Sequence, residues 1–243
     1  MGNELLDRFN EEKKMRLKGC IYHYTQIKFA YNTNRIEGSQ LTEDQTRYIF
    51  ETYTISTGDN KTANVDDIVE TINHFACFNY VLKIAKEPLS EIIIKEFHRI
   101  LKTGTSASFK DWFKVGDYKT MENIVGDIET THPSKVKKDM NKLISEYLNE
   151  KNIDIYKIID FHYHFEKIHP FQDGNGRVGR LIMFKECLNH DIIPFLIEDE
   201  NKQFYYMGLK EYPKSKTRLI DTCLFGQDNY KEILKYFNLP NYQ

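Results

Sequence analysis

One run, residues 169–180, constrains the fold of this 243-residue chain more than any other segment. It reads His-Pro-Phe-Gln-Asp-Gly-Asn-Gly-Arg-Val-Gly-Arg, with a helical apolar pattern before it and another after it. Pro170 predicts the end of the first helix, because its ring clashes with the preceding turn and it has no N–H to donate. Gly174 and Gly176 predict a tight turn at which the second helix begins. The run therefore predicts two helices joined by a glycine-rich turn that gathers polar side chains.

This turn is suited to binding phosphate. The first turn of a helix leaves about four backbone N–H groups unpaired and carries the positive end of the peptide dipole, so it attracts anions. Arg177 and Arg180 follow on that turn, and an arginine can bind phosphate oxygens through two hydrogen bonds. A salt bridge between helices is the alternative role for each arginine. No Lys-Ser or Lys-Thr pair follows the glycines, which excludes a P-loop.

A base and a carboxylate lie four residues apart in the same run. The imidazole of His169 has an unperturbed pKa near 6.5, which suits a general base at neutral pH. Asp173 could hold Mg²⁺ against the phosphates, or it could simply cap the helix. The pattern favours a site at which a polyphosphate and a proton acceptor lie side by side.

The run fills every fixed position of His-x-Phe-x-(Asp/Glu)-Gly-Asn-Gly-Arg-x-x-Arg, so the chain resembles the Fic-domain proteins. The resemblance implies an all-α Fic fold, a helical bundle with one short β-hairpin flap. It also implies transfer of AMP from ATP to a hydroxyl side chain of a target protein, with release of pyrophosphate. The target, not identified by the sequence, would dock on the flap.

The resemblance also implies roles for individual residues. His169 would deprotonate the target hydroxyl, and Asp173 would bind Mg²⁺ or Mn²⁺. Arg180 would hold the γ-phosphate, while Arg177 would contact the phosphate-binding loop or the phosphates. The anion hole would be formed by Gly174, Asn175 and Gly176.

Two further segments resemble parts of Fic proteins. Residues 116–119 and 124–126 resemble the flap, whose main chain pairs with the target as an added strand. A plain surface loop is the alternative. Tyr206, in the aromatic run 204–207, is expected beside the adenine, although core packing explains those aromatic residues equally well. The expected docking residues of the flap are Lys119, Ile124, Val125 and Gly126.

Near the N-terminus, Thr33-Asn34-Arg35-Ile36-Glu37-Gly38 resembles the pattern (Ser/Thr)-x-x-x-Glu-(Gly/Asn) of a Fic subgroup with an N-terminal inhibitory helix. That helix is expected at about residues 20–38. The resemblance implies that Glu37 pairs with Arg180 and occupies the place of the γ-phosphate. In related proteins this glutamate can position a water that removes AMP from a modified target, so a deAMPylating hydrolase is an alternative. A helix end with Gly38 as its cap is the structural alternative.

Composition narrows the class of protein. A net charge of −2 gives no general attraction to nucleic acid or membrane, and no apolar run approaches 18 residues. Four scattered cysteines without a Cys-x-x-Cys pair predict buried free thiols in a reducing cytoplasm. We therefore expect a cytoplasmic protein, and the family resemblance suggests a homo-oligomer.

Helical periodicity extends over nearly the whole chain. We expect N-terminal helices in residues 1–60 and a catalytic core in residues 61–243, packed as one compact unit. The expected helices are 4–18, 20–36, 42–53, 65–86, 90–104, 134–149, 154–168, 176–190, 200–212, 215–225 and 228–237.

Three other functions compete with AMP transfer. A metal-dependent hydrolase could use Asp160, His162, His164, Glu166 and His169, which lie close in sequence. Against it, residues two apart face opposite sides of a helix, so His162 and His164 would not share an ion. A non-catalytic binding module with the same fold is the second rival, and the complete motif argues against it. Transfer from another nucleotide or a phosphocholine donor is the third.

Overall fold

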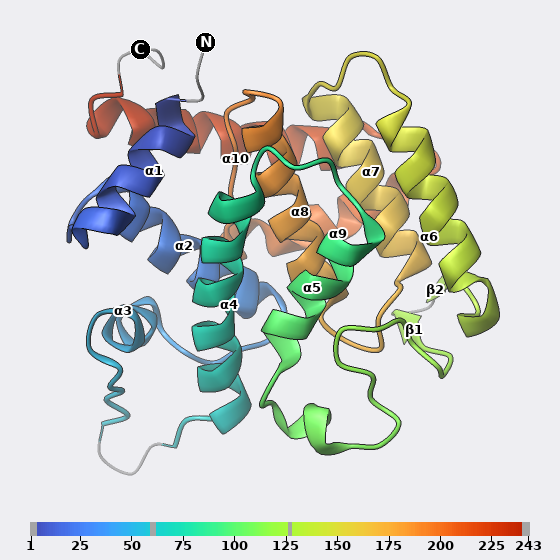
Figure 1. Ribbon diagram of the computed structural model, residues 1–243, viewed down its shortest axis with the longest axis horizontal. Helices are drawn as coiled ribbons and strands as arrows, with labels where there is room; N and C mark the ends of the chain where they lie inside the picture. Colours follow the sequence, from blue (N-terminus) through green and yellow to red (C-terminus); the bar gives the residue numbers. More distant parts are fainter. Residues whose placement is uncertain (1–3, 59–61, 126–127, 240–243) are drawn as a thin grey trace.

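The computed structural model describes residues 4–58, 62–125 and 128–239 (Figure 1). The described chain is helical apart from loops and one pair of two-residue strands, so the all-α prediction is confirmed. Its elements are α1 (Glu4–Met15), α2 (Ile21–Ile36), α3 (Glu43–Thr52), α4 (Val65–Ile84), α5 (Glu91–Lys102), η1 (Ser106–Phe109), β1 (Ile124–Val125), β2 (Ile128–Glu129), α6 (Pro133–Leu148), α7 (Ile155–Ile168), α8 (Asn175–Asn189), η2 (Asp199–Asn201), α9 (Lys202–Glu211) and α10 (Thr217–Tyr236).

Helix α8 is the centre of the molecule. Every residue from Asn175 to Leu188 is buried, because α2, α4, α5 and α7 all pack against it. In Figure 1, α4 and α5 lie in front of it and α6 and α7 to its right. Phe184 anchors it by stacking on Phe29 of α2 with ring centroids 5.3 Å apart. The first turn of α8 is therefore presented from a rigid core.

Helix α10 corrects the prediction of two separate helices at 215–225 and 228–237. The structure has one continuous helix, Thr217–Tyr236, with Gly226 in its interior. A Cβ on Gly226 would lie 2.5 Å from the carbonyl oxygen of Leu196. The glycine thus permits close packing of the helix against the 195–197 segment, and this packing outweighs the low helix propensity of glycine.

The two strands form a small antiparallel pair. Ile124 lies opposite Glu129, and Val125 lies opposite Ile128. Gly126, which the sequence assigned to the flap, lies outside the described residues.

Two other features follow from the burial pattern. The four cysteines are all buried and free, as the sequence predicted. Across the described residues, no helix combines the length and the apolar composition needed to cross a membrane.

Candidate active site

The glycine-rich turn is closed by its own side chains. Helix α7 ends at His169, which adopts the left-handed conformation with φ of +52° and donates its N–H to the carbonyl of Phe165. Asn175 accepts from the N–H of Phe171 at 2.8 Å and donates back to its carbonyl at 2.9 Å. Gly174, also left-handed, begins α8. This closed turn brings the end of α7 and the start of α8 to one place.

The start of α8 carries an anion supplied by the protein itself. A Cβ on Gly176 would overlap the carboxylate of Glu37, so only glycine leaves room for that carboxylate at the first turn. Unpaired N–H groups and the helix dipole favour negative charge there. The residue expected to imitate a phosphate thus lies where the sequence predicted an anion site.

Arg180 connects this carboxylate to the core. Its Nη2 donates to Glu37 Oε1 at 2.5 Å, and its Nε donates to the Thr33 hydroxyl at 2.7 Å. Nη2 also donates to the Thr33 carbonyl at 3.2 Å, and Nη1 to the Tyr205 hydroxyl at 3.4 Å. The side chain is 2% exposed. The first and fifth residues of the predicted inhibitory pattern therefore bind one buried guanidinium.

The end of α2 is held in place from the opposite side by η2 and α9. The Tyr206 hydroxyl donates to the Ile36 carbonyl at 2.8 Å, and the N–H of Asp199 donates to Asn32 Oδ1 at 3.0 Å. Gly38, at φ of +101°, follows the helix and turns the chain away. Tyr206, expected beside the adenine, is in this structure hydrogen-bonded to the end of α2.

His169 is a largely buried imidazole. Its Nδ1 lies 3.9 Å from Glu166 Oε2, and within the described part of the chain no group hydrogen-bonds to this nitrogen. Burial, helped by the charge of Lys119, lowers the pKa of His169 to about 4. The ring is therefore neutral at physiological pH and able to accept a proton.

Asp173 belongs to a ring of four alternating charges. Lys102 donates to Asp173 Oδ2 at 2.6 Å and also pairs with Glu70. Arg177 pairs with Glu70 and lies 3.8 Å from Asp173 Oδ2, which completes the ring. Arg177 also donates to Asn34 Oδ1 at 3.3 Å. Arg177 therefore forms salt bridges between helices, the alternative role that the sequence left open. Its contact with the glycine-rich turn is the one with Asp173.

The charge ring suits a cation site that substrate completes. Partial burial would raise the pKa of the Asp173 carboxyl, but Lys102 and Arg177 outweigh it and lower the pKa to about 2. The carboxylate is 53% exposed at the mouth of the turn. Mg²⁺ is commonly held by one or two carboxylates together with substrate phosphates. Among the described residues no group of three or more His, Cys, Asp or Glu side chains could hold a metal alone. The exposed Asp173 carboxylate could contribute one ligand to a cation, in competition with the Lys102 and Arg177 that pair with it in this structure.

Sequence reasoning missed Glu70 and Lys102. They lie on α4 and α5, far from the motif in sequence, and reach it only through packing around α8. One signal was available: Glu70 precedes buried His74 and Cys77 at i+4 and i+7, so it lies on the core-facing stripe of its helix.

The histidines proposed for a hydrolytic metal site are separated. His162 is buried and its Nε2 lies 2.6 Å from the Tyr205 hydroxyl. His164 is half-exposed and lies 3.5 Å from Asp160, which also accepts from Lys216. The two imidazoles face opposite sides of α7, as the two-residue spacing predicted.

Three buried histidines near the site predict the response of the protein to acid. Burial lowers the pKa of His74, His98 and His162 to about 3 each, against about 6.5 in an unfolded chain. Between these values the unfolded chain binds more protons, so the free energy of unfolding falls as pH drops from about 6.5 towards 3. Each histidine contributes up to about 1.4 kcal/mol per pH unit.

A buried carboxyl acts in the opposite direction. Burial raises the pKa of Glu166 to about 8, so its contribution to stability is lost as pH rises from about 4.5 through 8. Between pH 4.5 and 6.5, the effect of Glu166 on the free energy of unfolding cancels that of about one histidine. Urea denaturation at pH 7 and pH 5 should therefore still show a large loss at pH 5. Equal stability at the two values would contradict neutral buried imidazoles.

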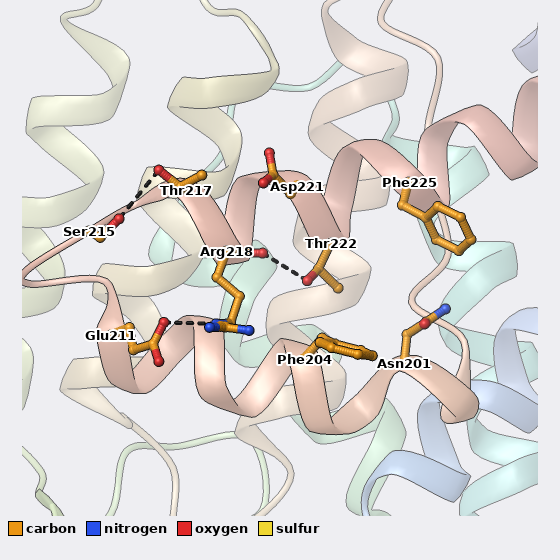
Figure 2. Close-up of a pocket in the computed structure, with 9 residues that line it drawn as sticks. All are labelled: Asn201, Phe204, Glu211, Ser215, Thr217, Arg218, Asp221, Thr222 and Phe225. Carbon is orange, nitrogen blue, oxygen red and sulfur yellow. Dashed lines mark hydrogen bonds and ion pairs between the residues drawn. The ribbon is translucent and has the colours of Figure 1, made fainter.

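The aromatic run of α9 is divided between two faces. Tyr205 and Tyr206 contact Arg180 and α2, whereas Phe204 lines a hollow of about 540 Å³ between α9 and α10. Figure 2 shows this hollow, with Phe204 and Phe225 on its walls and Arg218 bound to Glu211 at 2.8 Å. None of its lining residues belongs to the site at the start of α8.

Part of the chain is similar in sequence to a known protein family. Residues 88–187 match the sequence profile of the Fic/DOC family. Protein adenylyltransferase Fic from Nematostella vectensis is 27% identical over 228 residues, covering 87% of this chain and 51% of that protein. Protein adenylyltransferase fic-1 from Caenorhabditis elegans is 26% identical over 215 residues, covering 85% and 40%. The chain thus spans about half or less of the length of these curated relatives.

Solved structures share the fold. A Fic domain containing signaling protein from Bacteroides thetaiotaomicron superposes with a TM-score of 0.74 at 21% identity, covering 95% of this chain and 94% of that one. A Fic-1 fragment from C. elegans superposes with a TM-score of 0.75 at 20% identity, covering 96% and 72%. These likenesses show the Fic fold.

Proposed function

We propose that this chain, which carries a Fic domain, is a protein adenylyltransferase that transfers AMP from ATP to a hydroxyl of a target protein. We further propose that Glu37 inhibits it in the resting state. The observation that carries the proposal is the Glu37 carboxylate bound to Arg180 at the first turn of α8, beside a neutral imidazole. A triphosphate needs that same turn and that same guanidinium.

The reaction follows from the placement of these groups. The nitrogen of His169 that faces away from Glu166 takes the proton of the target hydroxyl. The hydroxyl oxygen then bonds to the α-phosphorus, and the bond from that phosphorus to the oxygen bridging to the β-phosphate breaks. Pyrophosphate leaves and AMP stays on the target.

The backbone at the start of α8 binds the negative charge of the phosphates. Gly174, Asn175 and Gly176 supply N–H groups there, and Arg180 holds the γ-phosphate once Glu37 has left. Asp173 holds Mg²⁺ or Mn²⁺, which neutralises phosphate charge when bound. Arg177 acts through the charge ring that fixes Asp173. Tyr206 borders the nucleotide on the α9 side.

The β1–β2 pair is the proposed flap. A two-stranded pair leaves an open edge whose main chain can hydrogen-bond to an extended target segment. Ile124 and Val125 would supply that edge, so docking would select the backbone conformation of the target more than its side chains.

The test uses ATP labelled in one phosphate at a time. The Glu37→Gly protein with Mg²⁺ and cell lysate should retain label from the α-phosphate on protein through denaturation, and no label from the γ-phosphate. Retention of the γ-label would indicate phosphoryl transfer instead. If neither label is retained with Mg²⁺ or Mn²⁺, the proposal is wrong.

A further inference from the structure

A buried lysine lies at the base of the β1–β2 pair. The Lys119 side chain is almost fully enclosed, with the whole residue 4% exposed. Its Nζ donates to Asn123 Oδ1 at 2.7 Å and to the Thr130 hydroxyl at 2.6 Å. Among the described residues no carboxylate lies within ion-pair distance of this Nζ. Burying an ammonium group without an opposite charge lowers the stability of the fold. Such a group is therefore a candidate for a functional role.

The same segment is attached to the motif directly after His169. The N–H of Lys119 donates to the Pro170 carbonyl at 2.8 Å, and Asn123 Nδ2 donates to the Phe171 carbonyl at 3.2 Å. The Thr130 hydroxyl also donates to Asn123, which connects the residue after β2 to the residue before β1. These bonds join both ends of the strand pair to the loop that carries the proposed base.

The charge of Lys119 acts on His169. After burial, it is the strongest influence that lowers the pKa of this imidazole. Glu37 on α2, Asp173 in the turn and the Glu166 carbonyl on α7 act in the opposite direction. Burial lowers the pKa of Lys119 itself to about 8, so the amine is still mostly charged at pH 7.

We propose that Lys119 is a positioning residue for AMP transfer: it fixes the β1–β2 pair to the loop that directly follows His169, and its buried ammonium is part of that attachment. The sequence assigned Lys119 to target docking. Its burial and its bonds to Asn123 and Thr130 enclose the side chain instead of presenting it to a target. This inference rests on the proposed function, but its first test does not depend on activity.

The first test is the titration of His169. In the Lys119→Met protein, NMR of labelled histidine should show His169 titrating at a pH about one unit higher, the effect expected for one partly screened charge at close range. Lys95→Met is the matched control, because Lys95 neighbours Tyr118 but forms ion pairs with Glu91 and Asp117. A folded Lys119→Met protein whose His169 titrates as in the wild type overturns the inference.

The second test separates the attachment from the charge. Thr130→Val removes the hydroxyl that accepts from Lys119 Nζ and donates to Asn123, and it removes no charge. His169 should therefore titrate as in the wild type while the Lys119 amide exchanges faster. In a Glu37→Gly background, Lys119→Met should move the acid limb of the pH–rate profile to higher pH by about one unit, and Thr130→Val should not. An unmoved acid limb in an active Lys119→Met protein contradicts the charge role. If Glu37→Gly is itself inactive, the NMR result still stands or falls alone.

Discussion

Replacing Glu37 with glycine is expected to raise the rate of AMP transfer at limiting ATP by roughly ten- to a hundredfold. The carboxylate makes a charge-assisted hydrogen bond to Arg180, whose side chain is 2% exposed, and such bonds are worth about 1.5–3 kcal/mol. ATP has to displace this bond before its γ-phosphate reaches the guanidinium. At about 1.4 kcal/mol per factor of ten, losing this bond would raise the apparent affinity for ATP by roughly ten- to a hundredfold.

Isothermal titration with ATP and the initial rate of label incorporation measure the Glu37 effect. Glu37→Gln keeps the shape and removes the charge, so it should give an intermediate release. Glu43→Gln is the matched control, since Glu43 forms a partly exposed pair with Lys28 away from the site. A Glu37→Gly protein that binds ATP no more tightly than the control would contradict the inhibitory role.

Replacing His169 with alanine in the Glu37→Gly background is expected to lower the rate about 10²–10⁴-fold, the usual contribution of a positioned general base. ATP affinity should change little, because the proposed phosphate ligands are the first turn of α8 and Arg180. The imidazole is not one of them. The expected pattern is thus a loss in kcat with nearly unchanged nucleotide binding.

His164→Ala provides the control for the His169 experiment. His164 is on the same helix but is half-exposed and lies beside Asp160. It should leave the rate unaltered. A His169→Ala protein that keeps most of its activity would contradict the role of His169 as the base.

The parts of the site that are local in sequence were predictable. The helix expected at 154–168 is Ile155–Ile168, and the one expected at 176–190 is Asn175–Asn189. Pro170 and the glycines fix this geometry through short-range sterics, so the pattern of the run is enough. The partnership of Glu37 with Arg180 came from the family resemblance, since residues 143 apart carry no local signal of contact.

The parts that depend on packing were not predictable. Lys102 meets both Glu70 and Asp173 only because α4 and α5 both pack on α8. The sequence predicted a break in α10 near Gly226, where the structure has a continuous helix. The reason for this glycine is its close approach to the carbonyl oxygen of Leu196, 30 residues earlier in the chain. The inward direction of Lys119 depends likewise on Thr130, beyond the strand pair.

Helix α2, which carries Glu37 at its end, is also part of the core. Phe29 of α2 stacks on Phe184 and meets Phe78 edge-on, so lifting the helix away would break both of these ring contacts. Glu37 comes after the last helical residue, Ile36, and is held there by Arg180 and by the tyrosine bound to the Ile36 carbonyl. Unwinding of that last turn would free the carboxylate while leaving the scaffold intact. On the proposed function, release of Glu37 would then need only a local change at the end of α2, with no displacement of the helix from the core.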